Sequence, residues 1–156
     1  MLEAHSITHL HKGDSVIDLV ATFEERQKSR YRTKTKCGKD VGWFLERGYV
    51  LREDDVLECS DGTLIRIICA DEAVSNVTAT TALSLLKAAY HLGNRHVPLQ
   101  VEDGFLRYQE DYVLDDMVKG LGLLVDHRQA SFQPESGAYS QSGGHTHEHS
   151  HAHSHD

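Results

Sequence analysis

The order of strand and helix patterns between residues 74 and 133 constrains the fold of this chain most strongly. The expected elements are a strand at 74–79, a helix from Thr80 or Thr81 to a left-handed C-cap at Gly93-Asn94, strands at 97–101 and 105–108, a helix at 110–121 and a strand that begins at 123–125. The resulting β-α-β-β-α-β order is that of a ferredoxin-like domain, in which two helices cover one face of a four-stranded sheet.

Hydrophobic periodicity assigns faces to the two expected helices. In the first helix, Leu83, Leu86 and Tyr90 share an apolar face, whereas Ser84, Lys87 and His91 lie on a more polar one. In the second helix, the expected buried stripe consists of Val113, Leu114, Met117, Val118 and Leu121.

The segments on either side of this unit have different patterns. Residues 1–72 are typical of short strands separated by turns: 17–23 and 64–70 are rich in apolar residues, and 28–36 alternate strictly between basic and uncharged residues. Residues 134–156 contain too little apolar surface to form a core. We therefore predict an α+β protein with a small all-β domain at 1–72, a ferredoxin-like domain at 73–133 and a disordered His-rich tail at 134–156.

Composition excludes several classes of function. Lysine and arginine number 16 against 24 acidic residues, a net charge of −8, which argues against general nucleic-acid binding. No apolar run approaches the roughly 18 residues of a membrane span, and the first residues do not resemble a secretory signal. The three cysteines, Cys37, Cys59 and Cys69, have no CxxC spacing. These features indicate a reduced, cytoplasmic protein.

Histidine gives the clearest chemical signal, because the chain has 12 and half of them lie near its end. They occupy every second position from 145 to 155, namely His145, His147, His149, His151, His153 and His155. Neutral imidazole binds nickel, copper, zinc and cobalt, so the pattern favours an adaptable site for several ions over an inert end or an added tag. His147-Glu148-His149-Ser150-His151 fits the HExxH zinc-protease pattern, but that pattern requires a rigid helix, which this segment does not favour.

Other residues are weaker candidates for metal binding. His96 follows the first expected helix, and a single histidine there completes a metal site only if a two-fold axis brings a second copy beside it. Candidate auxiliary ligands are His91, Glu110, Asp111, His9 and His11, with His5 near the last two. For Glu110 and Asp111 the favoured interpretation is that they complement the positive N-terminus of the second helix, although either could donate an oxygen to a metal. The basic stripe, which includes Lys28, Arg30, Arg32 and Lys34, is either a solvated strand face or a docking surface for an acidic partner.

Several segments of the sequence resemble those of a known protein family. The segment from Tyr90 to Gln100, with its Gly-Asn-Arg-His-Val-Pro-Leu-Gln string, is similar to the hallmark segment of the UreE urease accessory proteins. Leu106-Arg107-Tyr108, residues 113–117 and residues 132–139 match as well, and so do Lys28-Ser29-Arg30 and parts of residues 41–52. The similarity covers nearly the whole chain.

The resemblance implies a non-catalytic, dimeric nickel metallochaperone that hands Ni²⁺ to apo-urease through a complex containing an accessory GTPase. By position, His96 matches the family's ligand at the dimer interface and the tail histidines match its accessory region. Some relatives carry histidines where Glu110 and Tyr112 stand here, which puts an imidazole site at that place in doubt. Zn²⁺, Cu²⁺ or Co²⁺ would compete for the same imidazoles. The main alternative to a nickel carrier is a metal-storage or detoxification protein. A metallohydrolase and an RNA-binding module are weaker hypotheses.

Overall fold

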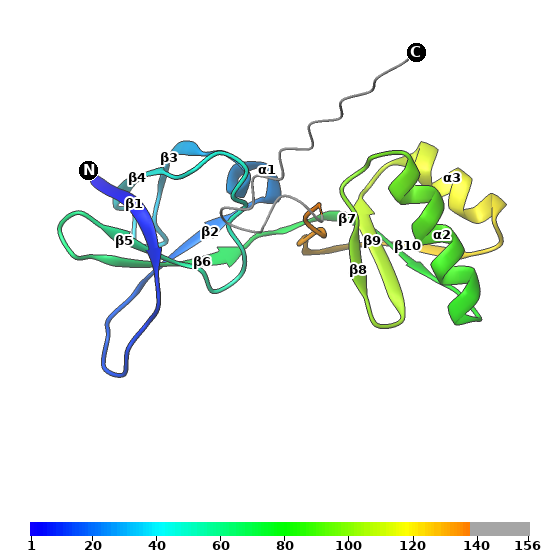
Figure 1. The fold of residues 1–156 in the computed structure, drawn as a ribbon, viewed down its shortest axis with the longest axis horizontal. Helices are drawn as coiled ribbons and strands as arrows, with labels where there is room; N and C mark the ends of the chain where they lie inside the picture. The colour runs from blue at the N-terminus through cyan, green and yellow to red at the C-terminus, as the bar shows by residue number, and fades with distance from the viewer. Residues whose placement is uncertain (138–156) are drawn as a thin grey trace, which may run out of the picture.

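The computed structural model describes residues 1–137, which form two β-sheets joined end to end (Figure 1). The first sheet contains β1 (Leu2–Thr8), β2 (Ile17–Ala21), β3 (Arg30–Lys34), β4 (Asp40–Phe44), β5 (Val56–Cys59) and β6 (Leu64–Cys69), with the short helix α1 (Phe23–Arg26) after β2. The second contains β7 (Asp71–Thr78), β8 (Gln100–Glu102), β9 (Phe105–Gln109) and β10 (Leu124–Ser131), with helices α2 (Ala82–Asn94) and α3 (Tyr112–Gly120). The expected α+β class is confirmed.

The six-stranded sheet has the order β2-β6-β5-β1-β4-β3, which leaves β2 and β3 at its edges. Its inward-facing residues, among them Leu19, Trp43, Leu57 and Ile65, are fully buried in one cluster. The Trp43 indole N–H donates a hydrogen bond of 2.8 Å to the Lys28 carbonyl, so the largest core side chain is also satisfied as a polar group.

The strand expected over 17–23 ends earlier, and a one-turn helix replaces its last part. Thr22 is the N-cap of α1: its hydroxyl accepts from the Glu25 N–H at 3.2 Å, and the Glu25 carboxylate accepts from the Thr22 N–H at 2.9 Å. This reciprocal capping box satisfies two backbone donors that an extended chain would have to pair elsewhere. Glu25 also accepts a hydrogen bond of 2.5 Å from the Tyr31 hydroxyl on β3.

The second sheet is antiparallel with the order β10-β7-β9-β8, and α2 and α3 lie beside one of its faces (Figure 1). Its element order, β7-α2-β8-β9-α3-β10, is the β-α-β-β-α-β series expected from the sequence. Val77, Leu92, Leu106 and Val118 are buried in one cluster between the sheet and the helices. Within residues 1–137, no helix is long and apolar enough to span a membrane.

Helix α2 packs on the sheet through a different face from the apolar one named by its sequence pattern. Ala88 and Leu92 are fully buried, whereas Leu83, Leu86 and Tyr90 are 61%, 67% and 70% exposed. The helix carries apolar side chains around much of its circumference, and the sheet takes the face with the small Ala88. The Leu83–Leu86–Tyr90 face is therefore left in solvent in the single chain.

Helix α3 begins at Tyr112, two residues after the expected start, because Asp111 is its N-cap and accepts from the N–H groups of Val113 and Leu114 at 2.9 Å and 3.2 Å. Leu114 and Val118 are buried as expected, but Val113 and Leu121 are exposed. Asp115, an acidic residue that is only 3% exposed, occupies part of the buried face that the pattern had assigned to Val113 and Leu121.

The junction between the sheets is packed and is held by a buried arginine. Only Ala70 separates β6 from β7, so the expected boundary between residues 72 and 73 falls inside β7. The Arg26 side chain, 1% exposed, donates to the carbonyls of Ala21 at 3.3 Å, Leu51 at 2.9 Å and Phe132. Phe132 follows β10 and meets the Phe23 ring edge-on at 5.3 Å. Arg26 thus joins the first sheet to the end of the second.

We expect Arg26→Met to lower the free energy of unfolding by about 3 kcal/mol, because three buried carbonyls lose their donor. Urea denaturation of the variant and the parent measures this difference. Arg47→Met, at an exposed position, is the matched control and should change stability by less than about 0.5 kcal/mol. Equal effects of the two substitutions would show that Arg26 does not hold the junction.

Glu25 should make stability depend on pH in the acid range. Burial raises the pKa of its carboxyl, but hydrogen bonds from Thr22 and Tyr31 outweigh burial and hold the pKa below its ordinary value of 4.5. A depressed pKa stabilises the folded state above the unfolded value, and this contribution is lost as pH falls through the folded value. The difference in thermal stability between the parent and Glu25→Gln should therefore be larger at pH 6 than at pH 3; a difference that is the same at both values would contradict this assignment.

Candidate functional site

The end of helix α2 places His96 in an unusual backbone conformation. Arg95 is the C-cap, and His96 follows it with φ of +57° while its N–H donates to the Gly93 carbonyl at 3.1 Å. The expectation that Gly93-Asn94 supplies the left-handed residue is wrong, since His96 adopts that conformation. Non-glycine residues pay a steric cost in this region, and such positions concentrate at functional sites. The turn fixes where His96 leaves the helix, and its side chain is exposed.

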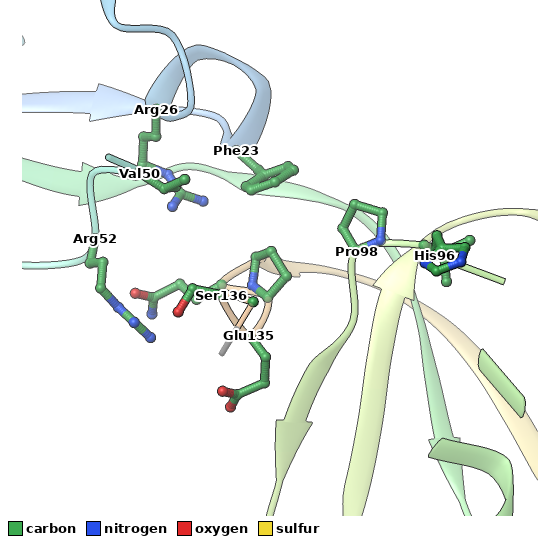
Figure 2. A pocket seen from close by; sticks show the side chains of 12 residues that line it. Phe23, Arg26, Val50, Arg52, His96, Pro98, Glu135 and Ser136 are labelled. Carbon is green, nitrogen blue, oxygen red and sulfur yellow. The ribbon is translucent and has the colours of Figure 1, made fainter. Parts of the chain in front are cut away.

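His96 stands at the rim of a cavity of about 370 Å³ at the junction of the two sheets (Figure 2). Phe23, Val50 and Arg52 line the cavity from the side of the first sheet, and His96 and Pro98 line it from the side of the second (Figure 2). Residues 133–137 also line it, and the Glu135 N–H donates to the Leu99 carbonyl at 2.7 Å. The first four residues of the predicted tail therefore lie against the junction beside the His96 loop.

One protomer does not assemble a complete metal site in the part of the chain that the structure describes. Among residues 1–137, no three histidine, cysteine, aspartate or glutamate side chains come together closely enough to hold an ion. His96 therefore offers one imidazole per chain, and further ligands would have to come from a second copy or from beyond residue 137. The tail histidines, His145, His147, His149, His151, His153 and His155, lie outside the described residues.

The auxiliary candidates are spread over the molecule. His91, in the last turn of α2, meets the Tyr90 ring edge-on at 5.4 Å and is exposed. One carboxylate oxygen of Asp111 caps α3. This is the structural role expected of an acidic residue just before a helix. Glu110 lies 3.6 Å from the His127 ring.

The N-terminal histidines do not converge. His5, on β1, stacks on the Phe44 ring at 5.1 Å and lies 3.5 Å from Glu3. β1 ends at Thr8, so His9 and His11 follow in the loop, where the His11 N–H donates to the Asp14 carboxylate at 2.7 Å. Because the strand stops between His5 and His9, extended alternation no longer places the three side chains on one face.

The basic stripe lies along an exposed sheet edge. Arg30, Arg32 and Lys34 are exposed residues of the edge strand β3, and Lys28 precedes the strand. Lys34 pairs with Asp40 at 2.9 Å, Arg30 lies 5.8 Å from the centre of the Phe44 ring and Lys28 lies 5.0 Å from that of Tyr31. The stripe therefore remains accessible to a partner along one margin of the molecule.

Sequence reasoning missed a polar group beneath α3. The His127 Nε2 lies 2.7 Å from one oxygen of Asp115, and the other oxygen accepts from the Tyr108 hydroxyl at 2.5 Å. The signal in the sequence was Asp115 within an apolar stripe, since a buried carboxylate needs partners. Its partners come from β9 and β10, which only strand pairing brings under the helix.

Comparison with known proteins agrees with this architecture. The UreE urease accessory protein N-terminal domain matches residues 2–70, and the UreE urease accessory protein C-terminal domain matches residues 72–156. The urease accessory protein UreE of Teredinibacter turnerae is 53% identical over 146 residues, which cover 93% of this chain and 95% of the relative. That of Saccharophagus degradans is 59% identical over 148 residues, which cover 93% and 88%. With both domains matched and identities above one half over almost the whole length, the chain belongs to the UreE family of urease accessory proteins.

Proposed function

We propose that this protein is a nickel metallochaperone, which binds Ni²⁺ as a homodimer in the cytoplasm and delivers it to apo-urease during assembly of the urease metal centre. Membership of the family implies a role in urease maturation. The observation that carries the nickel proposal is His96, an exposed imidazole held at a fixed left-handed position. Among residues 1–137, it belongs to no group of three or more potential metal ligands. The proposed role is that of a carrier, without catalysis.

The exposed face of α2 supports a dimer. Leu83, Leu86 and Tyr90 are each more than half exposed on the helix that ends at His96. Burying such a face against the same face of a second copy would remove apolar area from water without changing the fold. A two-fold axis close to the end of α2 would then bring two His96 rings to one ion.

Few ligands suit a carrier. Two imidazoles, with water or exchangeable groups in the other positions, would hold Ni²⁺ without enclosing it, so the ion could pass to another protein. The tail can reach this site: residues 133–137 line the same cavity as His96, and His145 comes eight residues after Gly137, a span of at most about 28 Å. We propose that the tail collects ions and passes them to His96.

His96→Ala should abolish tight Ni²⁺ binding in a protein that lacks residues 145–156, because the substitution removes two ligands from the shared ion. Native mass spectrometry with added Ni²⁺ should show one tight ion per dimer before the substitution and none after it, with the dimer retained in both. His91→Ala in the same shortened protein is the control and should keep the ion. A shortened His96→Ala dimer that still holds a tight ion would contradict the shared site.

The storage and detoxification alternative is favoured by the His-rich tail alone. A storage protein would lose its function with residues 145–156, whereas a carrier based on His96 would still activate urease without them. Urease activation by the shortened protein in cells lacking the native gene separates the two functions.

We further propose that β3 is a docking edge for an acidic segment of urease or of its accessory GTPase complex. The Leu45 N–H donates to the Ser29 carbonyl and the Thr35 N–H to the Lys39 carbonyl, both at 2.8 Å. In an antiparallel pair this alternation assigns Tyr31 and Thr33 to the bonds with β4 and directs the backbone groups of Arg30, Arg32 and Lys34 outward. The same three residues therefore offer both positive charge and free strand-pairing groups.

Reversing this charge with Arg30→Glu, Arg32→Glu and Lys34→Glu together should weaken association with the partner complex by at least about tenfold. Charges at the rim of an interface set the rate of association, and like charges across an interface repel each other. Surface plasmon resonance at several salt concentrations gives the affinity. The matched control reverses Lys12, Lys87 and Lys119, which lie away from β3. Equal loss in both variants would assign the effect to net charge rather than to the edge, and salt-dependent RNA binding by the parent protein would favour a nucleic-acid surface instead.

A further inference from the structure

Strand β10 is an open edge of the second sheet. The order β10-β7-β9-β8 gives it one neighbour, and within residues 1–137 no other strand pairs with it. It is eight residues long, whereas β8 at the opposite edge has three. Residues 126–129, in the middle of β10, are all exposed. An uncovered edge of this length presents a row of backbone groups that can pair with another strand.

The sheet register shows which backbone groups of β10 point outward. The Glu110 N–H donates to the Ala73 carbonyl at 3.1 Å, so Ala73 directs its backbone groups toward β9. Backbone direction alternates along a strand, so Asn76, three residues later, directs its groups toward β10, where it pairs with Asp126. The N–H and C=O of Asp126 are therefore used inside the sheet. By the same alternation, the outward-facing residues in the middle of β10 are Val125, His127 and Gln129.

The exposed part of β10 carries two charges of opposite sign. Asp126 and Arg128 are two residues apart and therefore lie on the same face of the sheet, with Arg128 Nη2 2.7 Å from Asp126 Oδ2. Their side chains are 50% and 49% exposed. Like charges at these positions would protect the edge against pairing with itself. An Asp-x-Arg sequence is instead complementary to an antiparallel copy of itself, because reversing the strand brings each charge opposite the other.

These charges select one register for two antiparallel copies of β10. Outward backbone groups must meet outward groups, which allows a two-fold axis at residue 126, 127 or 128. An axis at Asp126 or at Arg128 would place that residue opposite its own copy, and like charges directly opposite each other are destabilising. An axis at His127 places Asp126 opposite Arg128 of the second copy, and does so twice. It also places Leu124, which is 69% exposed, opposite Ala130.

We propose that β10 is a self-association edge, to which a second copy of this chain adds its own β10 in antiparallel orientation about a two-fold axis at His127. The outward N–H and C=O groups of Val125, His127 and Gln129 would then bond across the axis. Each His127 ring can stay with the Asp115 of its own chain, whose oxygen lies 2.7 Å from Nε2. Because β10 leads to the junction at Phe132, antiparallel pairing sends the two six-stranded sheets to opposite ends. The contact is separate from the exposed face of α2 and needs no metal ion.

Sedimentation equilibrium of the full-length protein tests this edge, with EDTA present to prevent association through bound metal. The average mass of the parent should rise with protein concentration. Asp126→Arg or Arg128→Asp alone places like charges opposite each other and should weaken the association at least about tenfold. Glu46→Arg, the same change of charge as Asp126→Arg at an exposed residue of the first sheet's side, is the matched control and should associate as the parent does.

The double variant Asp126→Arg with Arg128→Asp distinguishes this register from the other two. Exchanging the charges restores opposite signs only across an axis at His127, so the double variant should associate as strongly as the parent. Amide hydrogen exchange of the parent provides a second readout. Protection of the outward N–H groups of Val125, His127 and Gln129 should rise with protein concentration, whereas the inward N–H groups of Asp126 and Arg128 should be protected at every concentration.

A mass that does not change with concentration would overturn the self-association edge, and so would single variants that associate as the parent does or a double variant no stronger than the single ones. The dimer of the proposed function is tested separately with Leu86→Glu, which places a charge on the exposed face of α2. This variant should keep the concentration-dependent protection at residues 125, 127 and 129. Loss of that protection would assign the association to α2 instead of β10.

Discussion

The buried guanidinium of Arg26 is the interaction on which the arrangement of this molecule depends. An arginine stays charged inside a protein and has five N–H donors to satisfy. Here it meets carbonyls from β2, from the loop at Leu51 and from Phe132 after β10. The Phe23 N–H next to it donates to the Glu72 carboxylate at 2.8 Å, so a second polar contact crosses the same junction. A short connection at Ala70 would otherwise leave the two sheets free to hinge.

Because the junction is fixed, the His96 loop has fixed neighbours. Phe23, Val50 and Arg52 come from the first sheet and face His96, Pro98 and the start of the tail across one cavity (Figure 2). His96 is held in turn by the end of α2, at a backbone conformation that histidine tolerates better than most residues with a Cβ. The candidate ligand and the first residues of the tail therefore line one cavity.

The second sheet uses its helices for more than core packing. Helix α2 packs through Ala88 and Leu92, which leaves the larger Leu83, Leu86 and Tyr90 exposed. Helix α3 directs Asp115 into the sheet, where Tyr108 and His127 satisfy it. A carboxylate in such a place is costly unless it is fully bonded.

The sequence by itself determined the features that local chemistry controls. It predicted the β-α-β-β-α-β order, a cap of α2 at Thr80 or Thr81, and a strand over 64–70, because side-chain periodicity, capping residues and turn residues act over a few positions. The structure places the cap at Thr81 and ends the strand at Cys69. The similarity of the segment around His96 indicated the family correctly. Tertiary structure decided which face of α2 is buried, since a helix with apolar residues on two faces packs through the one whose size fits the sheet. It also decided that Arg26 joins the domains and that Asp115, Tyr108 and His127 meet, because these contacts depend on strand register and on the packing of segments far apart in the chain, which no local pattern encodes.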